Sequence, residues 1–206
     1  MAPVAIQPVM IFIDGGYLRK VFSDTIKTDK VNFDELKKFS LELVNSFSEP
    51  PIYVKPKQKI PIPSPEPLIY NALIRAFYYD AIIEKDDDPK KYAEQEEYLR
   101  HIRSLNFYEV KLGRLIKSGK GEPKQEGVDV LLAIDMITRA YENQYDIAVL
   151  VAGDDDFVDV VKAVKNTGKR VYGIYSEKCA SSRLIDSFDV RHPLTRQDID
   201  QLCIMG

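Results

Sequence analysis

VLVAGDDDF, at residues 149–157, is an apolar run that stops at a glycine and continues into three consecutive carboxylates. This order predicts a buried strand, a tight turn at Gly153 and a helix that starts near Phe157. The three acids would then stand together at the carboxyl end of the strand. Such a cluster is costly unless a positive charge neutralises it, and a divalent metal ion is the usual partner.

A second apolar run, VMIFI at residues 9–13, has the continuous hydrophobicity of a strand covered on both faces, and Asp14 follows it directly. Further strands are predicted at residues 75–79, 107–116, 146–151 and 170–175. Helical patterns lie between or after them, at residues 17–22, 33–47, 92–105, 127–140, 157–167, 181–188 and 195–203.

The alternation of strands and helices predicts an α/β fold, a three-layer α/β/α arrangement around a mainly parallel twisted sheet. Sites in such sheets lie beyond the carboxyl ends of the strands. Asp14 and Asp154 both follow apolar strands immediately, so we expect them to share that edge if the two strands are neighbours.

The 206 residues suit one domain, at 1–206, with 45% hydrophobic and 30% charged residues as in ordinary globular proteins. Residues 50–67 hold seven of the 12 prolines and are interpreted as an extended surface loop inserted before the second strand. Its lysines either contact a polyanion or are simply solvated. Residues 195–206 are expected to form a C-terminal helical tail.

Composition argues against several functional classes. The formal net charge of -3 provides no global positive field for nucleic acid. The two cysteines have no metal-ligand spacing, and the two histidines stand alone, which argues against Ser/His/Asp catalysis and histidine-rich metal sites. No apolar run approaches the roughly 18 residues of a membrane span, and no leader pattern is seen at the N-terminus, so we expect a cytoplasmic protein without membrane contact.

Four acids are candidates for one site: Asp14, Asp154 and Asp156 after the two strands, and Asp129 in the first turn of the helix at 127–140. A carboxylate on the apolar side of that helix must point toward the core or toward a site. Oxygen ligands of this kind suit Mg²⁺ or Mn²⁺. An ion held there would lower the pKa of bound water and clamp a phosphoryl oxygen.

Each acid also has a simpler explanation. Asp129 could be a helix-start acid favoured by the helix dipole, and Asp155 and Asp156 could be first-turn acids of the next helix. Asp135 has Arg139 four residues further on, so an ion pair within the helix explains it better than a metal site. Asp14 is the hardest to explain in this way, because it ends a buried run beside two glycines.

At these residues the sequence resembles the NYN domains, PIN-like nucleases of the LabA-like group. The motifs that carry the resemblance are IFIDGG at 11–16, RAFYYDA at 75–81, GVDVLLAID at 127–135, GDDDF at 153–157, GKRV at 168–171 and SSRL at 181–184. The resemblance implies a PIN-like fold and a metal-dependent ribonuclease. It assigns the catalytic and metal-binding roles to Asp14, Asp129, Asp154 and Asp156, with Mg²⁺ or Mn²⁺ as the cofactor.

The expected substrate is RNA, more readily a single strand, cut by water in line with the scissile phosphodiester. Arg75, Tyr78, Arg114 and Lys124 are candidates for gripping the phosphate backbone or stacking a base. Each of the four could equally be an ordinary strand or loop residue. The sequence is compatible with a homodimer and does not fix the oligomeric state.

Two departures from the family pattern keep a second hypothesis open. Tyr17 stands where the family usually has asparagine, and Glu126 displaces a lysine, leaving Lys124 further upstream. A non-catalytic RNA-binding or regulatory module on the same scaffold is therefore the alternative. A haloacid-dehalogenase-type phosphatase is a third hypothesis, since Asp154 and Asp159 fit its spaced aspartates, but Gly16 stands where that mechanism needs a second aspartate.

Overall fold

The apolar runs form the centre of a seven-stranded sheet in the computed structural model, which describes residues 4–47, 68–116 and 124–203. Its strands are β1 (Val4–Asp14), β2 (Leu68–Ile82), β3 (Tyr108–Ile116), β4 (Lys124–Glu126), β5 (Ile147–Val151), β6 (Arg170–Tyr175) and β7 (Val190–Pro193). They lie in the order β4-β3-β2-β1-β5-β6-β7. All neighbouring pairs are parallel except β3 and β4.

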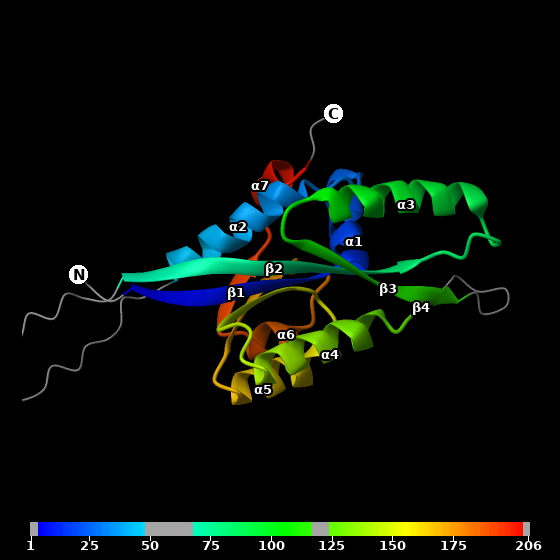
Figure 1. Ribbon diagram of the computed structural model, residues 1–206. Helices are drawn as coiled ribbons and strands as arrows, with labels where there is room; N and C mark the ends of the chain where they lie inside the picture. The colour runs from blue at the N-terminus through cyan, green and yellow to red at the C-terminus, as the bar shows by residue number, and fades with distance from the viewer. Residues whose placement is uncertain (1–3, 48–67, 117–123, 204–206) are drawn as a thin grey trace, which may run out of the picture.

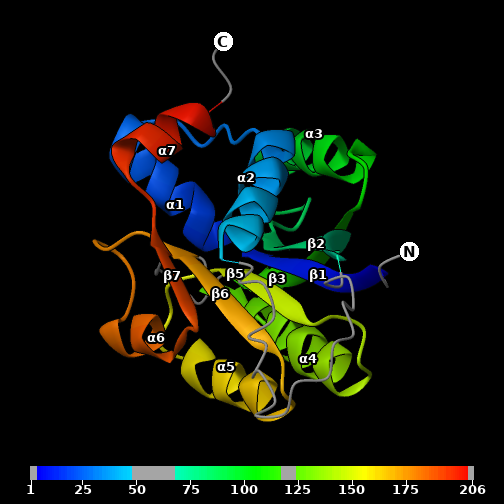
Figure 2. The same cartoon turned by 90° about the vertical axis from the view of Figure 1, so that its left-hand side faces the viewer.

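Helices cover both faces of this sheet (Figures 1 and 2). The first layer holds α1 (Gly15–Ile26), α2 (Phe33–Ser46), α3 (Pro89–Ser104) and α7 (Arg196–Gln201). The opposite layer holds α4 (Val128–Tyr141), α5 (Phe157–Asn166) and α6 (Ser182–Ser187). The predicted three-layer α/β/α fold with a mainly parallel sheet is therefore confirmed.

The two faces of the sheet have separate hydrophobic cores because side chains alternate along a strand. Ile11 and Ile13 of β1 pack with α1 and α2, whereas Phe12 packs with α4 and α5. All five residues of β5 are buried. A strand buried on both faces reads as an unbroken apolar run, which is why the sequence predicted the central strands well.

The order of the strands creates a crevice at one edge. From β1 the chain first builds β2 and β3 on one side, and later β5, β6 and β7 on the other. The direction of winding thus reverses between β1 and β5, and in open α/β sheets ligands bind beyond the carboxyl ends of the strands at such a point. Asp14 ends β1 at this position, and Gly153 and Asp154 follow β5.

Several elements differ from the sequence prediction. The strand predicted at 75–79 is part of the much longer β2, and neither β4 nor β7 was predicted. β7 is a short edge strand, only partly buried and ending in a proline, so it carries no hydrophobic signal. Within the helical tail predicted at 195–206, the structure has α7, which Thr195 caps, and residues 204–206 lie outside the described residues. The proline-rich segment at 50–67 lies outside the described residues.

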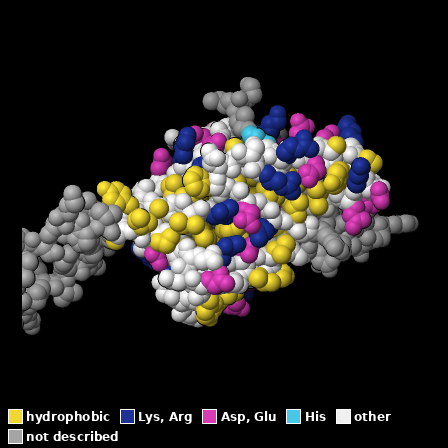
Figure 3. Space-filling model, in the orientation of Figure 1, with side chains coloured by type: hydrophobic (Ala, Val, Ile, Leu, Met, Phe, Trp, Pro, Cys, Tyr) yellow, Lys and Arg dark blue, Asp and Glu magenta, His cyan; other side chains and the backbone are white. Residues whose placement is uncertain are grey.

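The face of the molecule seen in Figure 3 carries charges of both signs close together, with hydrophobic side chains between them. Among the described residues, Arg75 pairs with Glu109, and Lys111 lies between Glu109 and Asp135. This face therefore offers ion pairs, and a polyanion would have to compete with the carboxylates for the cations.

Candidate functional site

Three of the four predicted acids line one pocket at the carboxyl edge of the sheet. Its volume is about 300 Å³. Its walls are Asp14, Asp129 and Asp154 together with Gly16, Tyr17, Lys20, Gly153 and Cys179. The three carboxylates come from the end of β1, the first turn of α4 and the turn after β5. The pocket thus lies at the crevice between β1 and β5 where the winding reverses.

Asp14 is built into the start of α1. Its backbone is extended, and its carboxylate accepts a hydrogen bond of 2.9 Å from the Tyr17 backbone N–H as the N-cap of the helix. The side chain is nearly buried, with 8% exposed. Burial raises the pKa of Asp14 to about 6, the bond from Tyr17 opposes that rise, and the negative charge of Asp129 adds to it.

Asp129 stands in the first turn of α4, where Gly127 adopts a positive φ of 81° as the N-cap and supplies no side-chain cap. The residue is exposed at the pocket. Partial desolvation of its carboxylate raises the pKa of Asp129, and the charges of Asp154 and Asp156 raise it further. The helix dipole alone would lower this pKa, so desolvation first and the neighbouring acids second outweigh the dipole.

The three acids after β5 have different partners. The Asp154 carboxylate accepts a hydrogen bond of 3.1 Å from the Asp156 backbone N–H and remains at the pocket. Asp155 is bound by the Ser181 hydroxyl at 2.5 Å and by Arg183, and so connects this turn to α6. Asp156 is not among the residues that line the pocket, but its charge acts on Asp129.

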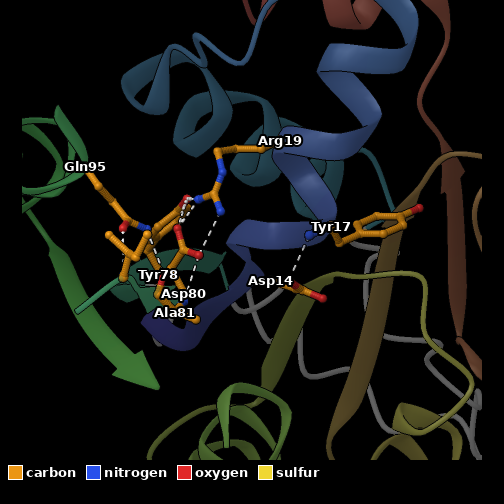
Figure 4. A network of polar contacts seen from close by, with 8 residues as sticks. Asp14, Tyr17, Arg19, Tyr78, Asp80, Ala81 and Gln95 are labelled. Atoms are coloured by element: carbon orange, nitrogen blue, oxygen red, sulfur yellow. Dashed lines mark hydrogen bonds and ion pairs between the residues drawn. The ribbon is translucent and has the colours of Figure 1, made fainter. Parts of the chain in front are cut away.

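Tyr17 forms a wall of the pocket, and in Figure 4 its ring lies to one side of the Asp14 carboxylate. Its hydroxyl accepts a hydrogen bond of 2.8 Å from the Ser176 backbone N–H after β6. Its ring lies so close over Gly153 that a Cβ at that glycine would overlap it. Burial raises the pKa of Tyr17 to about 12, so the phenol stays protonated at neutral pH.

Lys20 and Cys179 also line the pocket, and sequence reasoning missed both. Lys20 lies three residues after Tyr17 on the same side of α1, and helical spacing from the Asp14 motif could have indicated it. Cys179 sits in the loop after β6, and only the position of β6 beside β5 brings it to the pocket. Lys20 is exposed, and among the described residues no ion pair engages it, so it provides a cation beside the acids.

Of the four residues predicted to contact nucleic acid, Arg75 and Tyr78 do not line this pocket. Arg75 is exposed, and its guanidinium lies 3.6 Å from the Glu109 carboxylate. In the sheet Arg75 is paired with Met10, which lies four residues before the end of β1. Tyr78 is completely buried beneath Gly15 and therefore has no free ring face for a base. Arg114 and Lys124 lie on β3 and β4, and their side chains fall outside the described part of the chain.

Two acids set apart by the sequence analysis lie outside the pocket. Asp135 is 3.8 Å from Arg139, which confirms the ion pair within the helix, and it also accepts a hydrogen bond from Tyr79. Asp159, which the phosphatase hypothesis requires, is exposed and paired with Lys162 at 2.9 Å. Neither carboxylate takes part in the cluster around Asp14.

The donor set fits a hard divalent cation held loosely. Among residues 4–47, 68–116 and 124–203, no three or more His, Cys, Asp or Glu side chains come close enough to hold one metal ion. Mg²⁺, however, is usually held by one or two carboxylates, with water and substrate phosphate completing its octahedron. Asp14, Asp129 and Asp154 supply such carboxylates, and burial together with the neighbouring acids raises the pKa values of the first two.

A second acid near this edge is fully compensated. Asp80, two residues before the end of β2, pairs with Arg19 of α1, and it accepts hydrogen bonds of 3.0 Å from the Tyr78 hydroxyl and 2.8 Å from the Ala81 N–H. The Arg19 guanidinium also donates to Tyr78 at 2.7 Å. In Figure 4 this cluster and Asp14 lie on opposite sides of the first turn of α1.

Comparisons with known proteins agree with this architecture. The NYN domain pattern matches residues 8–195. A crystal structure from Vibrio parahaemolyticus, of VPA0982, a protein of unknown function, has 19% identity to this chain and a TM-score of 0.62, and the match covers 95% of this chain and 97% of that one. No curated protein matched. Within the described residues, none of the helices combines the length and the apolarity needed to cross a membrane.

Proposed function

This chain belongs to the NYN domain family, and from that premise we propose that it is a metal-dependent ribonuclease that cleaves single-stranded RNA at the pocket between β1 and β5. One observation supports the proposal most directly. Asp14, Asp129 and Asp154, from three separate elements, line the same pocket, and the first two have raised pKa values. Clustered acids with perturbed pKa values in a cleft are typical of functional sites.

In this mechanism one or two of the carboxylates of Asp14, Asp129 and Asp154 would hold Mg²⁺ or Mn²⁺, with Asp156 contributing negative charge near Asp129. Such an ion, when bound, supplies a water molecule of lowered pKa and neutralises charge on the phosphate. The Tyr17 backbone N–H keeps the Asp14 carboxylate in place. Lys20 is positioned to bind a non-bridging phosphate oxygen as the RNA enters.

The substrate is a flexible strand because the site is a shallow polar pocket at the edge of a sheet with mixed surface charge. A net charge of -3 makes general attraction to a polyanion weak. The RNA therefore depends on a few local contacts, and its affinity should fall only modestly with added salt.

The test is cleavage of a fluorescently labelled single-stranded RNA with Mn²⁺, with EDTA, and with Asp129→Asn. We expect cleavage with Mn²⁺ only, and a loss of about 100-fold or more in Asp129→Asn, as for removal of a group that stabilises the transition state. Asp159→Asn is the matched control, because this acid is exposed on α5 outside the pocket. Cleavage by the wild type that persists in EDTA, or equal rates in both variants, would refute the proposal.

A non-catalytic RNA-binding module remains the second candidate, favoured by Tyr17. Its ring covers Gly153 and its hydroxyl accepts the Ser176 N–H, so its side chain, unlike its backbone N–H, offers no polar group to the acids. Calorimetric titration with Mn²⁺ and with RNA separates the two hypotheses. RNA binding of equal strength with and without Mn²⁺, and no turnover, would favour the module.

A further inference from the structure

A second cavity lies at the same edge of the molecule, on the other side of α1. Its volume is about 400 Å³, within the range of small-molecule sites. It is formed by Arg19 of α1, Asp29 in the loop that follows, Ile83 just after β2, and one side of α3. The mechanism above uses none of these residues.

Charges of both signs line this cavity, and Asp80 already compensates the guanidinium of Arg19 from the side of the sheet. Arg19 and Lys91 supply two cations, and Asp29 and Glu94 supply two carboxylates. The carboxylates would repel a phosphate, so the walls suit an uncharged ligand that has both hydrogen-bond acceptors and donors. Ile83 and the ring of Tyr98 add an apolar surface against which a flat ring can pack.

The walls are held in place before any ligand arrives. The side-chain amide of Gln95 accepts a hydrogen bond of 3.1 Å from the Ile83 N–H and donates one of 2.6 Å to the Ala81 carbonyl, which fastens α3 to the end of β2 (Figure 4). The pairing of Arg19 with Asp80 fixes the opposite wall. Pre-organised walls lower the entropy cost of binding.

The cavity also has a defined relation to the proposed site of cleavage. Asp14 caps α1 on the side of the acidic pocket, and Arg19 leaves the same helix five residues later on the other side. The two cavities are therefore separated by the first turn of one helix, a distance on the order of ~10 Å. A nucleotide strand that crosses the end of α1 would meet both.

We propose that this second cavity binds a guanine base of the RNA, next to the phosphate held at the acidic pocket. Guanine carries two acceptors, O6 and N7, which Arg and Lys recognise, and its N1–H and amino donors suit carboxylates. Adenine lacks the carbonyl oxygen, and pyrimidines are smaller. The inference rests on the proposed ribonuclease function for its substrate, but it makes a separate claim about base selection.

The test uses nucleosides in EDTA, so that neither a metal ion nor a phosphate can occupy the acidic pocket. Guanosine, adenosine and uridine are titrated into the intact chain by calorimetry. We expect guanosine to bind about tenfold more tightly than the other two, and Asp29→Ala/Glu94→Ala to remove that preference. Glu97→Ala, an exposed acid of α3 outside the cavity, is the matched control and should bind guanosine like the wild type.

Equal binding of the three nucleosides, or unchanged guanosine binding in the double variant, would overturn the inference. Mapping of the cleaved bonds separates this failure from failure of the nuclease proposal. If the wild type cuts RNA without preference for guanine and binds no guanosine, only the base-binding inference fails. If guanosine binds at Asp29 and Glu94 but RNA stays intact with Mn²⁺, the nuclease proposal fails and the guanine site stands.

Discussion

Asp14 ends β1, and Asp80 lies two residues before the end of its parallel neighbour β2. Both are buried, yet their surroundings are opposite. Asp80 is 0% exposed and is surrounded by Arg19, the Tyr78 hydroxyl and the Ala81 N–H. Asp14 is 8% exposed and, within the described chain, accepts one hydrogen bond, from the Tyr17 N–H. Its near neighbours in the pocket include the acids Asp129 and Asp154.

The difference separates a structural acid from a functional candidate. A buried carboxylate that has a cation and hydrogen bonds is stable as part of the fold, and losing either partner of the pair is costly. A buried carboxylate near other acids disfavours its own charge and becomes stable only when a cation arrives. Asp80 and Asp14 thus have different roles at the same edge of the sheet, because Asp80 is paired with Arg19 and Asp14 is not.

The largest effect on stability is expected at Asp80, the acid that is paired with Arg19. Asp80→Asn leaves the Arg19 guanidinium without its counter-charge, and breaking a buried pair in this way should lower the free energy of unfolding by about 3–5 kcal/mol. Urea denaturation at pH 7 measures the loss. Asp186→Asn, which breaks the exposed pair with Arg191, is the control and should cost less than about 1 kcal/mol. If Asp80→Asn lowered the free energy of unfolding as little as the control does, Asp80 would not be the strongly stabilised acid described above.

At Asp14 we expect the opposite effect, a gain in the free energy of unfolding when the charge is removed. Its pKa in the folded chain is about 6, above the ordinary value of 3.8, so the folded state binds more protons than the unfolded state between these values. The free energy of unfolding of the metal-free protein should therefore fall as the pH rises from about 4 to 6, by about 3 kcal/mol at most.

Asp14→Asn removes that charge and keeps a good N-cap. The variant should be more stable than the wild type at pH 8 and similar to it below pH 4, in thermal melts recorded in EDTA. It should also lose the Mn²⁺-dependent gain in stability that ligand binding gives the wild type. An Asp14→Asn protein less stable than the wild type at pH 8 would show that Asp14 is compensated after all.

The smallest effect is expected at Tyr17, which forms a wall of the acidic pocket. Tyr17→Phe keeps the ring over Gly153 and removes the hydroxyl that accepts the Ser176 N–H, so it should cost about 1 kcal/mol. If Tyr17 is only a wall, the rate of RNA cleavage should stay within about twofold. A much larger drop in rate at equal stability would mean that the phenol takes part in the chemistry.

Features that depend on neighbouring residues could be predicted from the sequence, whereas contacts between residues far apart in the chain could not. The central strands could be predicted because burial on both faces leaves a continuous apolar run, and the Asp135–Arg139 pair because both residues lie on one helix. The partnership of Arg19 with Asp80 spans 61 positions, and nothing in either neighbourhood indicates it.

The same limit explains the candidate site. Asp14, Asp129 and Asp154 could be predicted because each stands at the end or start of an element facing the carboxyl edge. Tyr78 was assigned to RNA because an aromatic residue in a strand has the same sequence pattern whether it faces solvent or a helix. The packing of Gly15, Phe33 and Tyr98 around its ring places it in the core.

The close packing of Tyr17 on Gly153 links two positions 136 residues apart in the sequence. A methyl group at residue 153 would collide with the ring of Tyr17, and that ring has space only because residue 153 has no side chain. A smaller residue at 17 would relieve only part of this overlap, because the backbone carbonyl of Cys179 also lies 2.9 Å from the Cβ that alanine or serine would place at 153. In related chains we therefore expect glycine to remain at 153 even where the residue at 17 differs, as a record of both contacts.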